Sequence, residues 1–143
     1  MPWQAKRGDE AGPVWRYTEN PIIGRHGNSI SNSVFNSAVV PFENGYADVF
    51  RCDSVSISVD IFTVFSHVGI HWKISNEPIV FAGADAEILK KEYRYDPRVC
   101  LIDGKYYISW CNGYHGPTIG LAYTEDFKTF TQLENVFLPF NRN

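Results

Sequence analysis

The sequence lacks any long hydrophobic run. No segment approaches the ~20 consecutive apolar residues that a helix needs to cross a bilayer, and Met1–Gly12 contains no apolar segment of signal-peptide length. We therefore expect no membrane partner, and the sequence predicts a soluble, cytoplasmic protein.

Cysteine is scarce, and charge of one sign is not in excess. The three cysteines, Cys52, Cys100 and Cys111, have no C-x-x-C spacing and lie in apolar stretches, where a free cysteine behaves as a small hydrophobic residue. The formal net charge of -3 provides no broad positive field to hold nucleic acid. A reducing compartment and no nucleic-acid partner are the expectations.

Several catalytic signatures are also missing. There is no Gly-x-Ser-x-Gly, no glycine-rich phosphate loop ending in Lys-Ser or Lys-Thr, and no basic aromatic ladder. His67 and His71 are four residues apart, but the local pattern predicts strand and turn, which would separate the side chains by roughly 13 Å. We expect no metal site and no organic cofactor.

What the sequence does contain predicts an all-β fold. In 143 residues, 44% are apolar and 15% aromatic, enough for one sizeable core. Strands are predicted at Ser33–Phe42 and Tyr46–Asp53, joined by Glu43-Asn44-Gly45, and at Arg98–Ile102 and Lys105–Asn112, joined by Asp103-Gly104. Asn-Gly and Asp-Gly are typical of tight β-hairpins.

The two predicted hairpins repeat. Asn36 precedes Asp96 by 60 residues, and Val39 precedes Val99 by the same interval. Sheet units of this length, repeated along one chain, are typical of a β-propeller. The prediction is a single catalytic domain over residues 1–143, the N-terminal part of a propeller, with repeats at about 30–80 and 93–140; two repeats cannot close a ring.

Two further elements are expected. Ser54–Ile61 alternates serine or aspartate with valine or isoleucine, which predicts another strand. Asp85–Tyr93 could form a short helical turn with Asp85 as its cap.

Asp96 is the best candidate for an acid that cleaves a glycosidic bond, because it opens the first strand of its repeat, near a propeller's central channel. Position alone favours a plainer interpretation, an Asp-Pro turn in which Asp96 caps backbone or pairs with Arg98. Asn36 and Ser37 occupy the equivalent repeat position, where they could bind the same ligand or simply end a strand.

Two arginines are candidate binding residues. Arg51 interrupts an apolar stretch and needs a carboxylate or a ligand as partner. Arg142 could bind an anion, although an exposed arginine near the end of the sequence needs no such role.

The same residues carry a resemblance to glycoside hydrolase family 130, the β-mannoside phosphorylases. It covers most of the chain from Val14 onward. The segments that resemble the family are Trp15–Tyr17, Asn20–Ile23, Phe35–Phe42, Tyr93–Val99, Trp110–Gly120 and Phe137–Asn143.

The resemblance implies a five-bladed β-propeller, of which this chain covers about the first two blades. It also implies inverting phosphorolysis of β-1,4-mannosides: inorganic phosphate, as co-substrate, attacks the mannosyl anomeric carbon and releases α-mannose 1-phosphate and a shortened sugar. Site roles are implied in the same way. Asp96 would be the general acid with Tyr95 beside it, the mannosyl unit would be held by Asn36, Ser37 and Arg51, and Arg142 would bind phosphate.

Two departures from the family pattern stand out. Ser54–Val68 does not resemble the family although both of its flanks do. Asp48 stands where we expect a small residue, a harmless change if its side chain faces solvent.

Three functions remain open. The first is a phosphorylase acting on a β-mannoside disaccharide or oligosaccharide, whose full-length parent could form a homo-oligomer. The second is a β-mannoside hydrolase on the same propeller. The third is a catalytically silent fragment, because two blades leave strand edges exposed.

Overall fold

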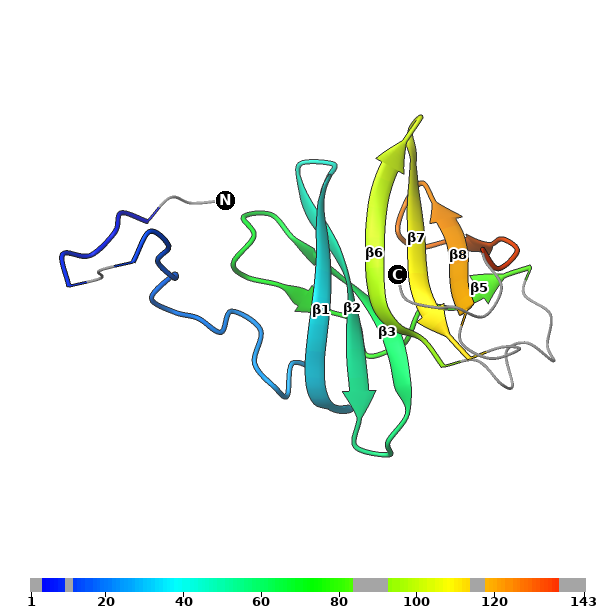
Figure 1. Cartoon of the computed structure of the whole chain (residues 1–143), viewed down its shortest axis with the longest axis horizontal. Helices are drawn as coiled ribbons and strands as arrows, with labels where there is room; N and C mark the ends of the chain where they lie inside the picture. The colour runs from blue at the N-terminus through cyan, green and yellow to red at the C-terminus, as the bar shows by residue number, and fades with distance from the viewer. Residues whose placement is uncertain (1–3, 10–11, 84–92, 114–117, 137–143) are drawn as a thin grey trace.

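The strands of the described part of the molecule form two β-sheets, and the N-terminal segment before Ser31 belongs to neither (Figure 1). This computed structural model describes residues 4–9, 12–83, 93–113 and 118–136. Within those ranges the secondary structure consists of strands without helices, so the all-β prediction is confirmed there. Every strand pairing is antiparallel except that of β5 with β9.

Strands that are consecutive along the chain are mostly neighbours within each sheet. The first sheet has the order β1-β2-β3-β4 and the second the order β5-β9-β8-β7-β6. Their bounds are β1 Ser31–Phe42, β2 Gly45–Ser54, β3 Val59–Ser66, β4 Lys73–Ile74, β5 Phe81–Ala82, β6 Tyr95–Ile102, β7 Lys105–Asn112, β8 Thr118–Thr124 and β9 Phe130–Gln132.

Both predicted hairpins are confirmed. β1 pairs with β2 across Glu43 and Asn44, and β6 pairs with β7 across Asp103-Gly104. Asp103 (φ 48°) and Gly104 (φ 80°) are both left-handed, as a tight two-residue hairpin turn of the mirror-image type requires.

The prediction that Ser54–Ile61 is one strand is wrong, because β2 ends at Ser54 and β3 begins at Val59. The Ser54 hydroxyl accepts a hydrogen bond from the Ser58 amide at 3.1 Å, and the Ser54 amide donates to the Ser58 carbonyl at 2.9 Å, closing a turn. Val55 and Ile57 are left 70% and 89% exposed. The serines bond locally to backbone here, a competitor to strand pairing that periodicity does not reveal.

Some sequence predictions are not tested here. The helical turn at Asp85–Tyr93 lies outside the described residues except for Tyr93. The two sheets occupy residues 31–74 and 81–132, but the assignment of residues 1–143 to one catalytic domain stays a prediction.

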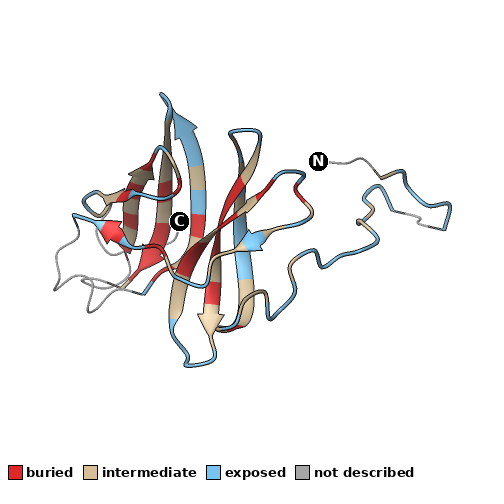
Figure 2. Ribbon diagram, turned by 180° about the vertical axis from the view of Figure 1, so that it is seen from behind, coloured by how far each residue is buried: buried red, intermediate tan, exposed pale blue. Residues whose placement is uncertain are grey.

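The main core lies between the two sheets (Figure 2). The first sheet contributes Val49 and Ile61, and the second contributes Trp110 and Phe127 among others. Phe127 meets the ring of Phe42 edge-on at a centroid distance of 5.0 Å. Burial of these large apolar side chains on both sheets is the main force that holds the sheets together.

Polar contacts also join the sheets. The Tyr106 hydroxyl donates to the Pro41 carbonyl at 2.9 Å. Arg94 Nη1 lies 3.1 Å from Asp60 Oδ1, and its guanidinium lies over the Phe81 ring at 4.8 Å. Burial raises the pKa of the Asp60 carboxyl, and the neighbouring Arg94 opposes that shift. The Arg94 guanidinium and the Asp60 carboxylate therefore stabilise each other's charged form at the junction of the sheets.

The described segments also bear on partners and metals. Within them there is no helix long and apolar enough to cross a membrane. Three or more histidine, cysteine or acidic side chains placed to hold a metal ion do not occur together within those segments. Cys52 and Cys111 are buried free thiols, and Cys100 is an exposed one.

Candidate active site

Each sheet places a polar residue at a β-bulge in its first hairpin strand. The β1–β2 register shifts between Phe35 and Ala38, and the β6–β7 register shifts between Tyr95 and Arg98. Asn36 and Asp96 lie within these shifts with φ of 48° and 55°. Asparagine and aspartate tolerate this left-handed conformation best among residues with a side chain. A bulge re-aims side chains, and here it re-aims the two that the repeat pairs.

Asp96 is tied to the first sheet through Arg51. Arg51 Nη1 lies 3.5 Å from Asp96 Oδ1. Arg51 also donates from Nε at 2.7 Å and from Nη2 at 2.9 Å to the two oxygens of Asp53. The Asp53 carboxylate raises the pKa of the guanidinium further, with a smaller contribution from Asp96. The two-pronged contact fixes the plane of the guanidinium, so its remaining nitrogen faces the candidate acid.

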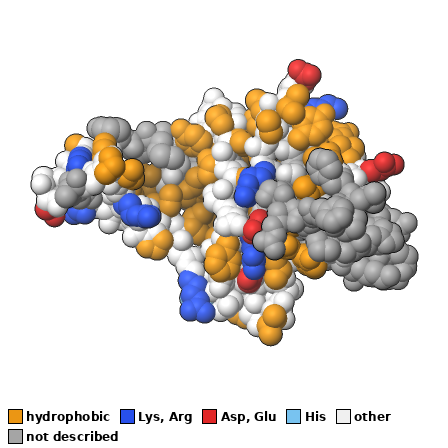
Figure 3. Space-filling model, in the orientation of Figure 1, with side chains coloured by type: hydrophobic (Ala, Val, Ile, Leu, Met, Phe, Trp, Pro, Cys, Tyr) orange, Lys and Arg blue, Asp and Glu red, His pale blue; other side chains and the backbone are white. Residues whose placement is uncertain are grey.

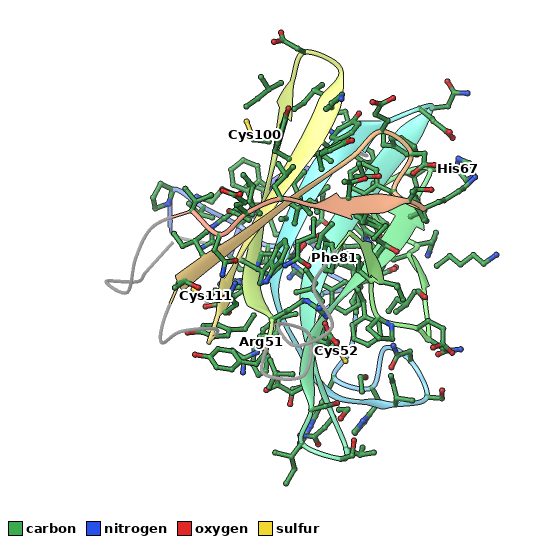
Figure 4. All side chains as sticks on the ribbon, turned by 90° about the vertical axis from the view of Figure 1, so that its right-hand side faces the viewer. Arg51, Cys52, His67, Phe81, Cys100 and Cys111 are labelled. Carbon is green, nitrogen blue, oxygen red and sulfur yellow. The ribbon has the colours of Figure 1, made fainter. Side chains whose placement is uncertain are left out.

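The Asp-Pro turn interpretation of Asp96 is only partly matched by these contacts. Arg98 donates to the main-chain carbonyls of Pro97 at 2.9 Å and of Asp96 at 3.5 Å. The carboxylate of Asp96 faces Arg51 on the other sheet instead. Figure 4 labels Arg51 near the beginning of β6.

Aromatic rings enclose the Arg51 guanidinium. Its central carbon lies 5.1 Å from the Phe35 ring centroid and 5.6 Å from that of Tyr95. Tyr95 in turn stacks on Tyr93 at 5.2 Å. Burial, with smaller contributions from Cys111 and Tyr93, raises the pKa of Tyr95 to about 12. Tyr95 is therefore a neutral hydrogen-bonding phenol at physiological pH, not a base.

A cavity of about 630 Å³ adjoins the first bulge, and Asn36 and Ser37 are among its lining residues. Its other side is formed by Arg16, Phe50 and Trp72, among others. Both Asn36 and Ser37 are exposed, so a ligand in the cavity could reach them. This volume lies within the range of small-molecule sites.

Asp48 also lines this cavity, and its side chain does not meet the condition of facing solvent under which its departure from the family pattern would be harmless. It is only 1% exposed. Strand alternation explains the placement, because its neighbours Ala47 and Val49 face the other sheet and Asp48 must face the opposite way. It lies on the side of Phe50 and Cys52, which form a second apolar cluster.

On the surface, charges of both signs meet where the two sheets join (Figure 3). A short row of basic and acidic side chains runs down the centre of that face, in front of the strands that carry the bulges, with apolar side chains around it.

The structure thus brings together part of the predicted site. Arg51 contacts both Asp96 and Tyr95. Asn36 and Ser37 line the cavity, whose described lining residues include none of those three. Arg142 lies outside the described residues, so its phosphate role stays a prediction. Sequence reasoning missed Asp53. The signal was present, since residues two apart on a strand share a face and Arg51-x-Asp53 pairs opposite charges.

The family assignment now has independent support. The family model for glycoside hydrolase family 130, described as beta-1,4-mannooligosaccharide phosphorylase, matches residues 1–143. The chain is also 50% identical over 150 aligned residues to the beta-1,4-mannooligosaccharide phosphorylase of Ruminococcus albus. That alignment covers 100% of this chain and 45% of the relative, so the chain spans less than half the relative's length.

Solved structures support the same fold. A beta-1,2-mannobiose phosphorylase from Listeria innocua is 17% identical, with a TM-score of 0.71, over 90% of this chain and 52% of its own. A protein of Parabacteroides distasonis described as a glycoside hydrolase is 20% identical, with a TM-score of 0.69, over 86% and 42% of the two chains. At these identities the likeness shows the fold alone. With the family match across its full length, the chain belongs to glycoside hydrolase family 130.

Proposed function

We propose that this chain supplies the acid and part of the sugar-binding wall of an inverting phosphorylase acting on β-1,4-mannosides. The observation that carries the proposal is the placement of Asp96, held at a bulge and facing Arg51 from the other sheet. The 50% identity to the Ruminococcus albus enzyme supports the same activity and linkage.

In this reaction a phosphate oxygen forms a bond to the mannosyl anomeric carbon as the glycosidic C–O bond breaks. Asp96 supplies the proton that the leaving oxygen takes up, by way of a hydroxyl of the sugar. The products are α-mannose 1-phosphate and a shortened sugar. One carboxylic acid is enough, because phosphate replaces the water that a second carboxylate activates in an inverting hydrolase.

The remaining residues bind and orient. Arg51, stiffened by Asp53, donates to sugar hydroxyls next to the acid, and Tyr95 closes the site beside it. Asn36 and Ser37 hold the mannosyl unit from the cavity side. Arg142 contributes to phosphate binding, and phosphate as co-substrate is the only small molecule required besides the sugar.

The proposal extends to the architecture and setting of the protein. The two sheets serve as the first two blades of a five-bladed β-propeller, with the bulged strands nearest its central channel. In the cell the protein is cytoplasmic, where phosphate is abundant, and it acts on a disaccharide or oligosaccharide, in a homo-oligomer if its full-length form assembles.

The test is phosphate dependence. Full-length protein is given β-1,4-mannobiose with and without inorganic phosphate, and sugar phosphate and free mannose are both measured. We expect α-mannose 1-phosphate to form only with phosphate. Mannose released equally fast without phosphate would establish the hydrolase instead, and no cleavage under either condition would leave the catalytically silent reading.

A further inference from the structure

Asp48 makes two short hydrogen bonds to the bulge of β1. Its Oδ2 accepts from the Ser37 hydroxyl at 2.7 Å, and its Oδ1 accepts from the Ala38 amide at 2.7 Å. The bulge displaces this stretch from the regular β1–β2 ladder, so the Ala38 amide needs an acceptor other than a strand carbonyl. Asp48 supplies that acceptor from the partner strand.

The placement is costly for a carboxylate. Asp48 is 1% exposed, and burial raises its pKa despite the opposing hydrogen bonds from Ser37, Ala38 and the Val49 amide. In the second sheet the matching register position, the partner of Val99, is Ile108, a fully buried apolar residue. An apolar side chain is therefore compatible with this position in the repeat, and the carboxylate is a particular feature of the first sheet.

The contact commits the Ser37 hydroxyl. A serine hydroxyl has one proton to donate and two lone pairs that accept. An ionised carboxylate only accepts, so the Ser37 proton points at Asp48. Ser37 is exposed and lines the cavity, so toward the cavity it offers lone pairs alone. Among the described residues that line the cavity, Arg16 is the only charged residue besides Asp48. On β3 the residue paired with Asp48 is Val64, which is apolar.

We propose that Asp48 is a positioning residue that turns Ser37 into an obligate hydrogen-bond acceptor, so that this wall of the cavity selects a ligand hydroxyl that donates. The inference rests on the proposed function in one respect, since it takes that hydroxyl to belong to the mannosyl unit. Beyond that function, the inference states that Ser37 accepts rather than donates in its contact with the sugar, and that Asp48 sets this direction.

Asp48→Asn provides a nearly isosteric test. The amide oxygen can still accept from Ala38, but its NH2 group then faces Ser37 and donates to it. Ser37 then turns its own O–H toward the cavity. There it donates a hydrogen bond instead of only accepting one, so the polarity of the contact reverses. Asp48→Gly, which removes the partner altogether, is the second variant in case the first folds poorly. Asp103→Asn, the same chemical change at an exposed hairpin turn, is the matched control.

The probes are mannose and its monodeoxy and monodeoxyfluoro analogues, with dissociation constants measured by calorimetry on full-length protein. Fluorine cannot donate a hydrogen bond. At one ring position we expect wild type and the Asp103→Asn control to bind the fluoro analogue about 2–10-fold more weakly than mannose, the size of one hydrogen bond. That ratio should fall toward one in both Asp48 variants. Circular dichroism and melting temperature verify that the variants are folded.

The outcomes separate the inference from the proposed function. An unchanged ratio in a folded Asp48 variant overturns the inference, as does wild-type protein that cleaves mannobiose with phosphate but discriminates at no position. Wild-type protein that discriminates as expected, yet shows no phosphate-dependent cleavage, overturns the proposed function and supports the inference. A role of Asp48 in folding alone would change the melting temperature without changing the ratio.

Discussion

The two hairpins use one backbone device to present different chemistry. In each, the first strand is broken by a bulge at a left-handed polar residue, Asn36 in β1 and Asp96 in β6. The first presents a neutral amide and the second a carboxylic acid. Under the proposed function, the repeat preserves the geometry of a site position, and the side-chain atom there, nitrogen in Asn36 or oxygen in Asp96, decides between binding and proton transfer.

What lies behind each bulge also differs. The first has Ser37 backed by the buried carboxylate of Asp48. The second has Pro97 at the position of Ser37, and Ile108 packs in the core behind it. The first bulge is fixed by hydrogen bonds and the second by a ring-locked φ and apolar packing. Only the first adds a polar group to the adjoining cavity.

The largest effect is expected when the second bulge is made to resemble the first. Asp96→Asn keeps the shape and the tolerance for left-handed φ but removes the proton donor. Phosphorolysis of β-1,4-mannobiose by full-length protein should slow about 10²–10⁴-fold, which initial rates of α-mannose 1-phosphate formation would measure.

The melting temperature of Asp96→Asn serves as its control, since the amide fits the same backbone. A variant that is folded and cleaves at the wild-type rate would remove Asp96 from the reaction. Loss of the melting transition would show instead that the carboxylate holds the junction of the sheets through Arg51.

A smaller effect is expected where the sheets differ in packing. At matching register positions the first sheet stacks Phe50 on Phe62 at 5.9 Å, whereas the second places Trp110 over Gly120. A Cβ on Gly120 would overlap the buried Trp110 ring. Gly120→Ala should therefore lower the free energy of unfolding by about 1–3 kcal/mol in urea titrations.

The matched test of that packing is the double variant Trp110→Phe with Gly120→Ala, which gives the second sheet a phenylalanine at the position of Phe50. If the clash is the cause, the double variant should lose less stability than the sum of the single variants. Strict additivity would mean that Gly120 matters for another reason.

Sequence reasoning reached the parts of this comparison that depend on local pattern. The two turns and the 60-residue repeat predicted both hairpins and paired Asn36 with Asp96. It failed where side chains bond in ways that alternation does not encode. The serines around Ser54 close a turn, and Asp48, which alternation turns away from the main core, accepts hydrogen bonds from the bulge of the neighbouring strand. Neither the depth of a strand position nor the gap left by a bulge can be read from periodicity.

The smallest expected effect concerns Tyr95, whose counterpart one residue before the first bulge is Phe35. Both rings flank Arg51, so Tyr95→Phe keeps the ring contact and removes only the hydroxyl. The folded-state pKa of about 12 lies above the ordinary tyrosine value of 10.0. The stability linked to this hydroxyl is therefore fully present below pH 10 and is lost as the pH rises through about 12.

Wild type should lose free energy of unfolding relative to Tyr95→Phe only across that window, as urea titrations at a series of pH values would measure. Phenolate absorbance offers a second readout, and a wild-type-minus-variant difference that is complete by pH 10 would contradict the raised pKa of this hydroxyl.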